Sequence, residues 1–376
     1  MGKWVKKKLG EGLVDRICTG KLDANAMVDG GLYRFYTCAK DYTYIDDYAF
    51  DDEALLISGN GEYVGYVHYY RGKFNAYQRT YVLRGFSIDV KYLQSYLNCF
   101  LRDRIKKEMN AGSIPFIKMG TLTDMYISYP SSLSEQRRIA SILSSADKVI
   151  DSTQKLIAKY KSIKQGMMED LLKPKEGWKK LKLGECLRQK PDYGINAPAV
   201  EYDNNLPTYL RITDITEDGY YSRNDIVSVS SLDALNYKLE DGDLVFARTG
   251  ASVGKTYLYN QKDGILVFAG FLIRVRTDEQ IVLSQFFKYQ TQTPNYKNWI
   301  AANSMRTGQP GINGNEYGEF TFYIPYKNDN PDLSEQRRIA SILSSIDKKI
   351  ESEKKVLEKY KKIKKGLMEK LLKGEE

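Results

Sequence analysis

The stretch that decides the fold is LSEQRRIASILSSADKVIDSTQKLIAKYKSIKQGMMEDLLK, residues 133–173, because the chain contains it twice. The second copy, LSEQRRIASILSSIDKKIESEKKVLEKYKKIKKGLMEKLLK, covers residues 333–373, and the two copies are identical at 29 of 41 positions. An internal repeat constrains the architecture more strongly than any other sequence feature. Each copy lacks proline and begins with a candidate capping serine, Ser134 or Ser334, so each predicts one long helix.

Apolar residues recur in both copies at a mean spacing of about 3.5 residues, which is typical of a coiled coil. A helix of this length extends over roughly 60 Å, so a globular core cannot cover its apolar stripe from end to end. The other copy is the economical partner, and we predict an antiparallel two-helix coiled coil. The residues expected at the coiled-coil and partner interface are Ile139, Ile142, Val149, Leu156, Tyr160, Ile163, Ile339, Ile342, Ile346, Val356, Tyr360 and Ile363.

A globular block precedes each helix. WVKKKLGEGL at residues 4–13 returns as WKKLKLGECL at residues 178–187. Both blocks are rich in short runs of Tyr, Val and Ile bounded by turn residues, which predict strands. Each block also contains one stretch with helical periodicity, at residues 90–110 and at residues 284–298.

The predicted fold is therefore α+β, with two mostly-β domains separated by a long antiparallel coiled coil and related by a pseudo-two-fold internal repeat. The expected order is globule, helix, globule, helix. The corresponding domains are residues 1–132, 133–173, 174–332 and 333–376.

Composition narrows the functional class. Residues 134–173 carry 8 basic and 5 acidic residues and residues 334–373 carry 13 and 6, so of the net charge of +9 the remainder of the chain contributes −1. Basic helix faces are often only solvated, so this charge favours nucleic-acid binding weakly. The basic N-terminus has no apolar run behind it, and no stretch reaches about 18 uninterrupted apolar residues. We therefore expect a cytoplasmic protein that does not bind a membrane.

The sequence lacks the residue patterns of catalytic and metal sites. Its four cysteines, Cys18, Cys38, Cys99 and Cys186, are far apart without a CxxC pair, which argues against a zinc site and a disulfide framework. The single histidine, His68, lies in a strand-like run, and neither HExxH, GxSxG nor the (N/D)PP(Y/F/W) motif of amino-methyltransferases occurs. We expect a chain without catalytic residues, metal ligands or a cofactor of its own.

The segment Gly250-Ala-Ser-Val-Gly254-Lys255-Thr256 is similar to a phosphate-binding loop, but only three residues separate its glycines where that motif needs four. The first block has a matching pair, Gly61 and Gly65, without the Lys-Thr. We interpret both pairs as tight turns, and a nucleotide-hydrolysing enzyme is an alternative function.

Reading bases in a DNA groove requires Arg, Lys, Asn or Gln side chains on rigid turns. The candidates for DNA contact in the first block are Arg71, Lys73, Gln78 and Arg79. In the second block they are Arg248, Thr249, Lys255, Arg306, Gln309 and Asn313. The 30 tyrosines add side chains that suit an interface when they are exposed.

Two unlike blocks, each opened by W-x-x-x-x-LGE and each followed by LSEQRRIASILSSxDKxI…KY…GxMExLL, resemble the specificity subunit of type I restriction–modification systems. The resemblance covers nearly the whole chain. It implies that each block is a target-recognition domain for one half of a split double-stranded DNA site. One departure is that the first block has Gly59-Asn60-Gly61 where the second has Arg248-Thr249-Gly250, so we expect its turn to contact DNA differently.

The resemblance also implies the partners. The coiled coil would set the spacer between the half-sites and dock two adenine-N6 methyltransferase subunits, and ATP-driven restriction subunits would join them. S-adenosylmethionine, ATP and Mg²⁺ are expected on those partners, with none on this chain. The alternative from another class is a coiled-coil interaction scaffold whose globular domains bind proteins.

Overall fold

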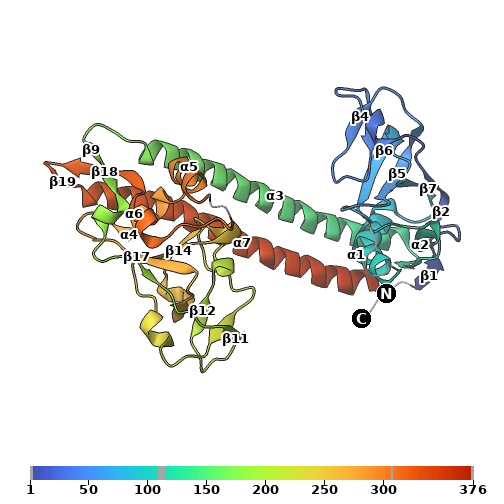
Figure 1. Ribbon diagram of the computed structural model, residues 1–376. Coiled ribbons are helices and arrows are strands. Elements are labelled where there is room, and N and C mark those ends of the chain that lie inside the picture. The colour runs from blue at the N-terminus through green and yellow to red at the C-terminus, as the bar shows by residue number, and fades with distance from the viewer. Residues whose placement is uncertain (1–2, 109–114, 306–307, 374–376) are drawn as a thin grey trace. The chain divides into compact units, whose positions relative to one another are not determined.

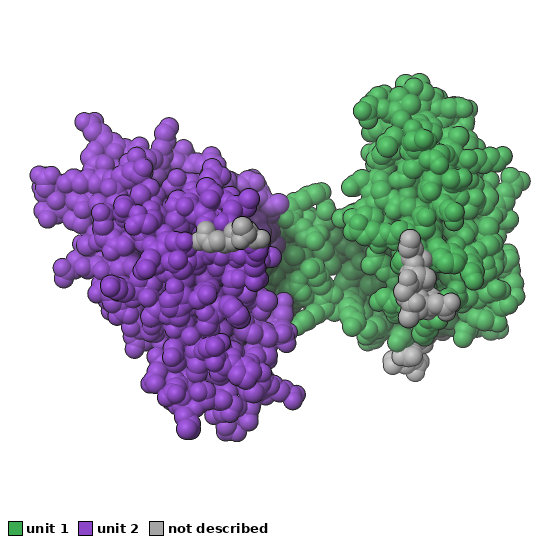
Figure 2. All heavy atoms as spheres, viewed as in Figure 1, with its two compact units in different colours: residues 1–155, 354–376 green, residues 156–353 purple. Residues whose placement is uncertain are grey.

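The computed structural model describes residues 3–108, 115–305 and 308–373. The chain divides into two compact units, coloured separately in Figure 2. Unit 1 comprises residues 1–155 and 354–376, and unit 2 comprises residues 156–353. Each unit therefore contains one globular head and a part of each long helix. The finer division into four domains stays a prediction.

The head of unit 1 is built on a six-stranded sheet with the order β2-β7-β5-β6-β3-β4. Its strands are β2 (Val14–Thr19), β3 (Tyr33–Tyr36), β4 (Thr43–Ile45), β5 (Phe50–Ser58), β6 (Val67–Ala76) and β7 (Thr80–Phe86). Successive side chains of β5 point to opposite faces. Leu55 and Ile57 pack with helix α1 (Val90–Glu108), while Ala54 and Leu56 belong to a second core with Phe74.

A second, two-stranded sheet completes unit 1. Strand β1 (Trp4–Lys8) pairs antiparallel with β8 (Tyr126–Pro130), which follows the short helix α2 (Met119–Thr123). In unit 2, β9 (Trp178–Lys182) pairs in the same sense with β18 (Thr321–Lys327), and β19 (Asn330–Pro331) extends that sheet. Both repeated Trp segments are thus strands beside the start of a long helix.

The head of unit 2 contains two four-stranded sheets, with the orders β10-β17-β14-β15 and β11-β13-β12-β16. The first comprises β10 (Asp192–Tyr193), β14 (Asp243–Ala247), β15 (Thr256–Leu258) and β17 (Leu272–Arg276). The second comprises β11 (Ala199–Glu201), β12 (Thr208–Leu210), β13 (Val227–Val229) and β16 (Leu266–Phe268).

The single helix predicted over residues 284–298 is two helices in the structure, α4 (Ser284–Gln290) and α5 (Pro294–Asn303). Thr293 caps α5 by accepting the amide of Tyr296, and Pro294 occupies the first helical position, where its missing N–H costs nothing. A last short helix, α6 (Gly314–Gly318), precedes β18.

The two long helices are confirmed as α3 (Leu133–Leu172) and α7 (Leu333–Lys373), green and red in Figure 1. Both begin one residue before the predicted capping serines, so Ser134 and Ser334 lie inside the first turn. Asp332 performs the capping of α7, because its Oδ1 accepts the amide of Glu335 at 2.9 Å. No helix among the described residues combines the length and apolar character that crossing a membrane requires.

The long helices pack antiparallel within each unit. In unit 1, Ile139 and Leu143 near the start of α3 share a core with Leu372 near the end of α7. In unit 2, Leu172 near the end of α3 shares a core with Ile339 near the start of α7. The predicted antiparallel coiled coil is confirmed.

Buried and half-buried residues define the seam of this coiled coil, and they follow one another at alternating spacings of four and three. In α3 they are Ile139, Leu143, Ala146, Ile150, Thr153, Ile157, Tyr160, Lys164, Met167 and Leu171. The residues 200 positions later form the seam of α7, where Tyr360 is exposed. Such alternation is the heptad geometry of a coiled coil.

The predicted coiled-coil and partner interface stays a prediction. Of its residues, Ile139 and Ile339 are buried, and Ile142, Leu156, Tyr160, Ile342 and Ile346 are half-buried. Residues 142, 149, 156 and 163 also alternate in threes and fours with residues 139, 146, 153 and 160, so the sequence contains two equally regular stripes. Val149, Ile163, Val356 and Ile363 are exposed. Their role in binding a partner stays a prediction.

Candidate nucleic-acid interface

The two glycine pairs found in the sequence form equivalent turns. Gly61 and Gly65 in unit 1, and Gly250 and Gly254 in unit 2, have φ between 68° and 85°, the left-handed region that side chains avoid. In each turn the second glycine donates its N–H to the carbonyl seven residues earlier, at 2.8 Å and 3.0 Å. A Cβ on either second glycine would lie 2.8 Å from an isoleucine of the neighbouring helix. The interpretation as tight turns is confirmed.

The loop at residues 250–256 does not have the geometry of a phosphate-binding loop. It leads into strand β15, whereas a phosphate-binding loop opens a helix. The Nζ of Lys255, which would reach the phosphates, pairs with Glu217 at 2.7 Å. Nucleotide hydrolysis therefore has no support in the structure.

In unit 2, the predicted residues Arg248 and Thr249 lie at the first turn glycine and are held by their backbones. Thr249 forms an isolated β-bridge with Gly311. The carbonyl of Arg248 accepts the amide of Ile312 at 2.9 Å. The strand end that carries Arg248 is thus clamped to the segment that carries the other candidates.

Gln309 and Asn313 lie on that second segment. The side chain of Gln309 covers Gly250, where an added Cβ would be 2.8 Å from its Nε2. Asn313 uses its Oδ1 to cap α6, so its side chain has a structural role already. Lys255 is partly neutralised by its ion pair, and Arg306 lies outside the described residues. Of the residues predicted in unit 2, Arg248, Thr249 and Gln309 therefore lie close together. Their side chains remain available to contact a ligand.

In unit 1, Arg71 and Lys73 share one face of strand β6, because they are two residues apart in the strand. Both are exposed. The Nζ of Lys73 lies 4.4 Å from the centroid of the Tyr48 ring, and the Tyr48 hydroxyl raises the pKa of Lys73. This face combines positive charge with an exposed aromatic ring.

Gln78 and Arg79 lie in the turn between β6 and β7. Gln78 donates to Asp23 at 3.4 Å, and the carbonyl of Arg79 accepts the amide of Gly59 at 2.9 Å. Arg79 is therefore adjacent to the Gly59-Asn60-Gly61 turn, the counterpart of Arg248-Thr249-Gly250. The four candidates of unit 1 thus occupy two separate places in the fold, a strand face and a turn.

The sequence prediction missed a group of tyrosines around Arg34 in strand β3. Tyr42 and Tyr44 are 36% and 42% exposed, and their rings pack edge to face. The guanidinium of Arg34 lies over the rings of Tyr42 and Tyr70. Residues 33–36, Tyr-Arg-Phe-Tyr, predict a strand, and no local sequence pattern there indicates the ring contacts of Arg34.

Neither metal nor thiol chemistry is indicated among the described residues. No group of three or more His, Cys, Asp or Glu side chains there is placed to hold a metal ion. Cys186 is buried, which raises the pKa of its thiol to about 12 and keeps it protonated. The other three cysteines are half-buried and unpaired.

Comparison with known proteins agrees with the repeated architecture. The chain matches the family described as the type I restriction modification DNA specificity domain over residues 1–162 and again over residues 170–362. Two solved structures show the same fold over 99% of this chain. The S subunit of a type I restriction–modification system from M. genitalium has 18% identity and a TM-score of 0.68 over 96% of its length. A structure from work on complex assembly of the type I R-M system has 14% identity and a TM-score of 0.53 over 97% of its length.

Two relatives share sequence similarity. The type I restriction enzyme EcoDI specificity subunit of Escherichia coli is 42% identical over 154 residues, which cover 40% of this chain and 33% of that protein. The type I restriction enzyme MjaVIII specificity subunit of Methanocaldococcus jannaschii is 25% identical over 292 residues, covering 72% of this chain and 66% of that protein. The matches thus span about a third and just under two thirds of the relatives' lengths.

The expectation of a non-catalytic chain agrees with these names, since both relatives are specificity subunits and the matched domain is one of DNA specificity. The family match covers most of the chain and falls once on each half of the internal repeat. The chain therefore belongs to the type I restriction–modification DNA specificity family.

Proposed function

We propose that this chain is the DNA-recognition subunit of a type I restriction–modification complex, in which each head reads one half of a bipartite, asymmetric site in double-stranded DNA. The observation that carries this proposal is the pair of equivalent turns with unequal surfaces. Both turns have the same glycines and the same hydrogen bonds, but Arg248 in unit 2 corresponds to Gly59 in unit 1. Equal scaffolds with unequal side chains suit two different half-sites.

The chemistry of the exposed side chains supports DNA as the ligand. Arg71 and Lys73 in unit 1 are exposed and Arg248 in unit 2 is half-buried. Arg248 has a ring contact and no ion pair among the described residues, while Arg71 and Lys73 lie opposite Glu53 and Asp51 in the sheet. Lys and Arg contacts to phosphates supply most of the affinity of such proteins, and contacts to base edges supply the specificity. The unread bases between the two half-sites would form a spacer, with its length set by the coiled coil.

The coiled coil also supports docking of two copies of one partner. Ile163 and Ile363 are exposed at equivalent positions of the repeat. Val149 in α3 and Val356 in α7 are exposed too, although they are not equivalent to each other. These residues leave an apolar stripe beside the seam of each helix. Two methyltransferase subunits would each find one such stripe, and the restriction subunits would join that core.

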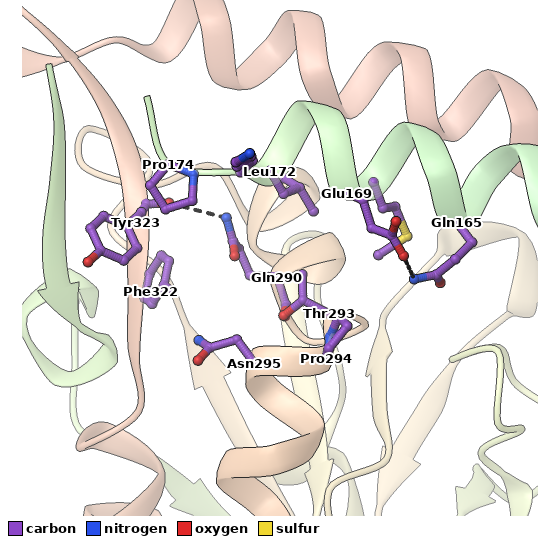
Figure 3. Close-up of a pocket in the computed structure, with 12 residues that line it drawn as sticks. Gln165, Glu169, Leu172, Pro174, Gln290, Thr293, Pro294, Asn295, Phe322 and Tyr323 are labelled. Carbon is purple, nitrogen blue, oxygen red and sulfur yellow. Dashed lines mark hydrogen bonds between the residues drawn. The ribbon is translucent and has the colours of Figure 1, made fainter. Parts of the chain in front are cut away.

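Each unit also has a pocket near the last turns of a long helix. In unit 2 it encloses about 350 Å³ and is lined by Met168 and Glu169 of α3 together with residues of α4, α5 and β18 (Figure 3). In unit 1 a larger pocket of about 880 Å³ is lined by Met368 and Glu369 of α7 together with residues of α1. Met168 and Met368 are equivalent in the repeat, as are the two glutamates. A partner present in two copies would dock at both pockets.

S-adenosylmethionine, ATP and Mg²⁺ would be bound by the partner subunits.

Exchange of one head tests the proposal. Replacing residues 1–132 by the corresponding block of another family member should change one half of the methylated site and leave the other half and the spacer intact. Replacing residues 174–332 should change the opposite half. Sequencing the methylated adenines of a host that expresses each chimera together with its methyltransferase measures this directly. A change in both halves from a single exchange would contradict the proposal.

The scaffold alternative gives a different result in the same system. A protein-binding scaffold would leave the methylated site unaltered in either chimera. Its complex would also show no steep loss of duplex DNA retention with rising salt, because no counterions would be released on binding.

A further inference from the structure

Among the described residues, four arginines place the guanidinium over an aromatic ring. Two of them, Arg84 and Arg274, also bind an aspartate, at 2.6 Å and 2.5 Å. The other two, Arg34 and Arg248, have no carboxylate partner among the described residues. One of these two lies in each unit. An arginine that contacts a ring but no carboxylate keeps its N–H donors available to bind a ligand.

Arg34 is held between two rings. The carbon at the centre of its guanidinium lies 4.2 Å from the centroid of the Tyr42 ring and 4.5 Å from that of the Tyr70 ring. Of its five N–H donors, Nη1 contacts the Tyr36 hydroxyl at 3.5 Å. Every buried side-chain nitrogen of Arg34 has a hydrogen-bond partner, so the donors without a partner are those that reach solvent. Ring contacts use the flat faces of the guanidinium and leave the edge free.

Arg248 is held from its backbone and from one ring. Its amide donates to Phe271 at 3.1 Å and its carbonyl accepts from Ile312 at 2.9 Å. The guanidinium lies 5.0 Å from the centroid of Tyr193, and the Tyr193 hydroxyl accepts the amide of Gly314 at 3.1 Å. The ring that supports the arginine is thus itself fixed to the start of α6.

A guanidinium with a fixed plane and a free edge presents two parallel N–H donors. Two groups of duplex DNA match such a fork: the O6 and N7 atoms of guanine in the major groove, and two oxygens of a phosphate. A phosphate does not require a fixed plane, and a lysine ammonium binds it as a point charge. The ring supports of Arg34 and Arg248 therefore favour the guanine edge.

We propose that Arg34 and Arg248 each read one guanine, Arg34 in the half-site of unit 1 and Arg248 in the half-site of unit 2. This inference rests on the proposed DNA-recognition function and names the side chains that carry it. It also explains how unit 1 can read a guanine although Gly59 stands where unit 2 has Arg248. In unit 1 the reading arginine comes from strand β3, where exposed Tyr42 supports it.

The test uses the full chain in its methyltransferase complex, with Arg34→Ala, Arg34→Lys, Arg248→Ala and Arg248→Lys variants. Each alanine variant should lose roughly 10- to 100-fold of the preference for guanine at one position of one half-site. The lysine variants should lose as much, because lysine keeps the charge but not the fork. Sequencing of methylated adenines in the host and binding of duplexes with that one base pair randomised both measure this preference.

Matched controls are Arg84→Ala in unit 1 and Arg223→Ala in unit 2, because both arginines pair with a carboxylate. They should retain the full preference at every position. Tyr42→Ala and Tyr193→Ala keep the arginines but remove their supports, and both should give a partial loss at the same positions. These exposed tyrosines also keep the test decisive if an arginine variant unfolds, which a thermal melt would reveal.

Two outcomes would overturn the inference. Lysine variants that match the unsubstituted chain, with alanine variants that weaken all sequences equally and flatten the salt dependence, would make the arginines phosphate contacts. Alanine variants that keep the guanine preference would remove both arginines from base reading. In either case the unsubstituted chain would still direct methylation to a bipartite site, so the proposed function would stand. Absence of such a site would instead reject the proposed function.

Discussion

One ion pair occurs twice in the coiled coil, once in each unit, and its surroundings differ. Lys164 of α3 pairs with Asp347 of α7 in unit 2, and Lys364 of α7 pairs with Asp147 of α3 in unit 1. The two pairs are equivalent in the repeat, because Asp147 and Asp347, and likewise Lys164 and Lys364, lie 200 positions apart. The side chains of Lys164 and Asp347 are 13% and 10% exposed, whereas those of Lys364 and Asp147 are 25% and 56% exposed.

The heads cause this difference. In unit 2, helix α4 supplies Tyr289, whose hydroxyl donates to Asp347 at 2.9 Å, and Lys288, whose Nζ lies 3.9 Å from the same carboxylate. Burial lowers the pKa of Lys288. In unit 1, Asp147 has no partner other than Lys364 among the described residues. The repeat thus encodes the pair, and the diverged head decides how much the pair contributes.

The largest expected effect comes from replacing the aspartate of each ion pair by alanine. Asp347→Ala removes the counter-charge of two lysines whose side chains are only 13% and 16% exposed, and should destabilise unit 2 by about 3–5 kcal/mol. Asp147→Ala removes one partner of an exposed pair and should cost less than about 1 kcal/mol. Chemical denaturation of the full chain, followed by hydrogen exchange in each unit, measures both costs. Similar costs would show that the head of unit 2 does not shield its pair.

Replacing the second turn glycine should lower the stability of both units, which tests whether the two turns are equivalent. Gly65→Ala and Gly254→Ala each force a side chain into left-handed backbone, at a cost of about 1–2 kcal/mol. A clash with Ile105 or Ile300 adds to it, because the added Cβ would lie 2.8 Å from either side chain. Thermal melts should therefore show destabilisation of both variants. The loss should be larger for Gly254→Ala, because the contact there is with Cγ2 of Ile300 and not with a terminal Cδ1 as in Ile105.

The matched control shortens the isoleucine. In the Gly65→Ala variant, Ile105→Val removes the clashing Cδ1, and in the Gly254→Ala variant, Ile300→Ala removes the clashing Cγ1 and Cγ2. Each second substitution should recover the part of the loss that comes from the clash. A turn that accepts alanine in only one unit would mean that the two turns are not one scaffold.

Local patterns in the sequence predicted much of the fold. The long helices, their antiparallel pairing and the turn glycines follow from periodicity, repetition and spacing, which the chain carries in contiguous residues. The seam is ambiguous in the sequence, because two stripes of equal regularity share Ile139 and only packing selects Leu143 over Ile142. The break between α4 and α5 was missed although Pro294 marks it in the sequence.

The candidate site was less accessible to sequence reasoning. Arg248 was found because a recognisable turn surrounds it. Arg34 was not, because Tyr42 and Tyr70 reach it only through the pairing of β3 with β4 and β6. Such pairings join residues far apart in the chain, and no local pattern reports them. The burial of Lys164 and Asp347 depends likewise on α4, which is separated from both long helices in the sequence.

The smallest expected effect concerns His68, the chain's single histidine, which places one titrating group in unit 1 and none of its kind in unit 2. Its Nε2 lies 3.0 Å from the carbonyl of Ala39, and burial among tyrosine rings lowers the pKa of His68 below its ordinary value of 6.5. The unfolded chain therefore binds more protons between the two pKa values, so stability falls as the pH drops below 6.5 toward the folded pKa. The slope from one such group is at most about 1.4 kcal/mol per pH unit.

His68→Gln keeps a donor for Ala39 but cannot titrate, so it should remove this part of the pH dependence. Denaturation of both proteins at pH 7.5 and pH 5.5 separates the histidine from carboxylates that both share. The unsubstituted chain should lose more stability in unit 1 than the variant does, while unit 2 should change equally in the two proteins. An identical pH response in unit 1 would mean that the folded histidine binds its proton as readily as the unfolded one, which contradicts its burial.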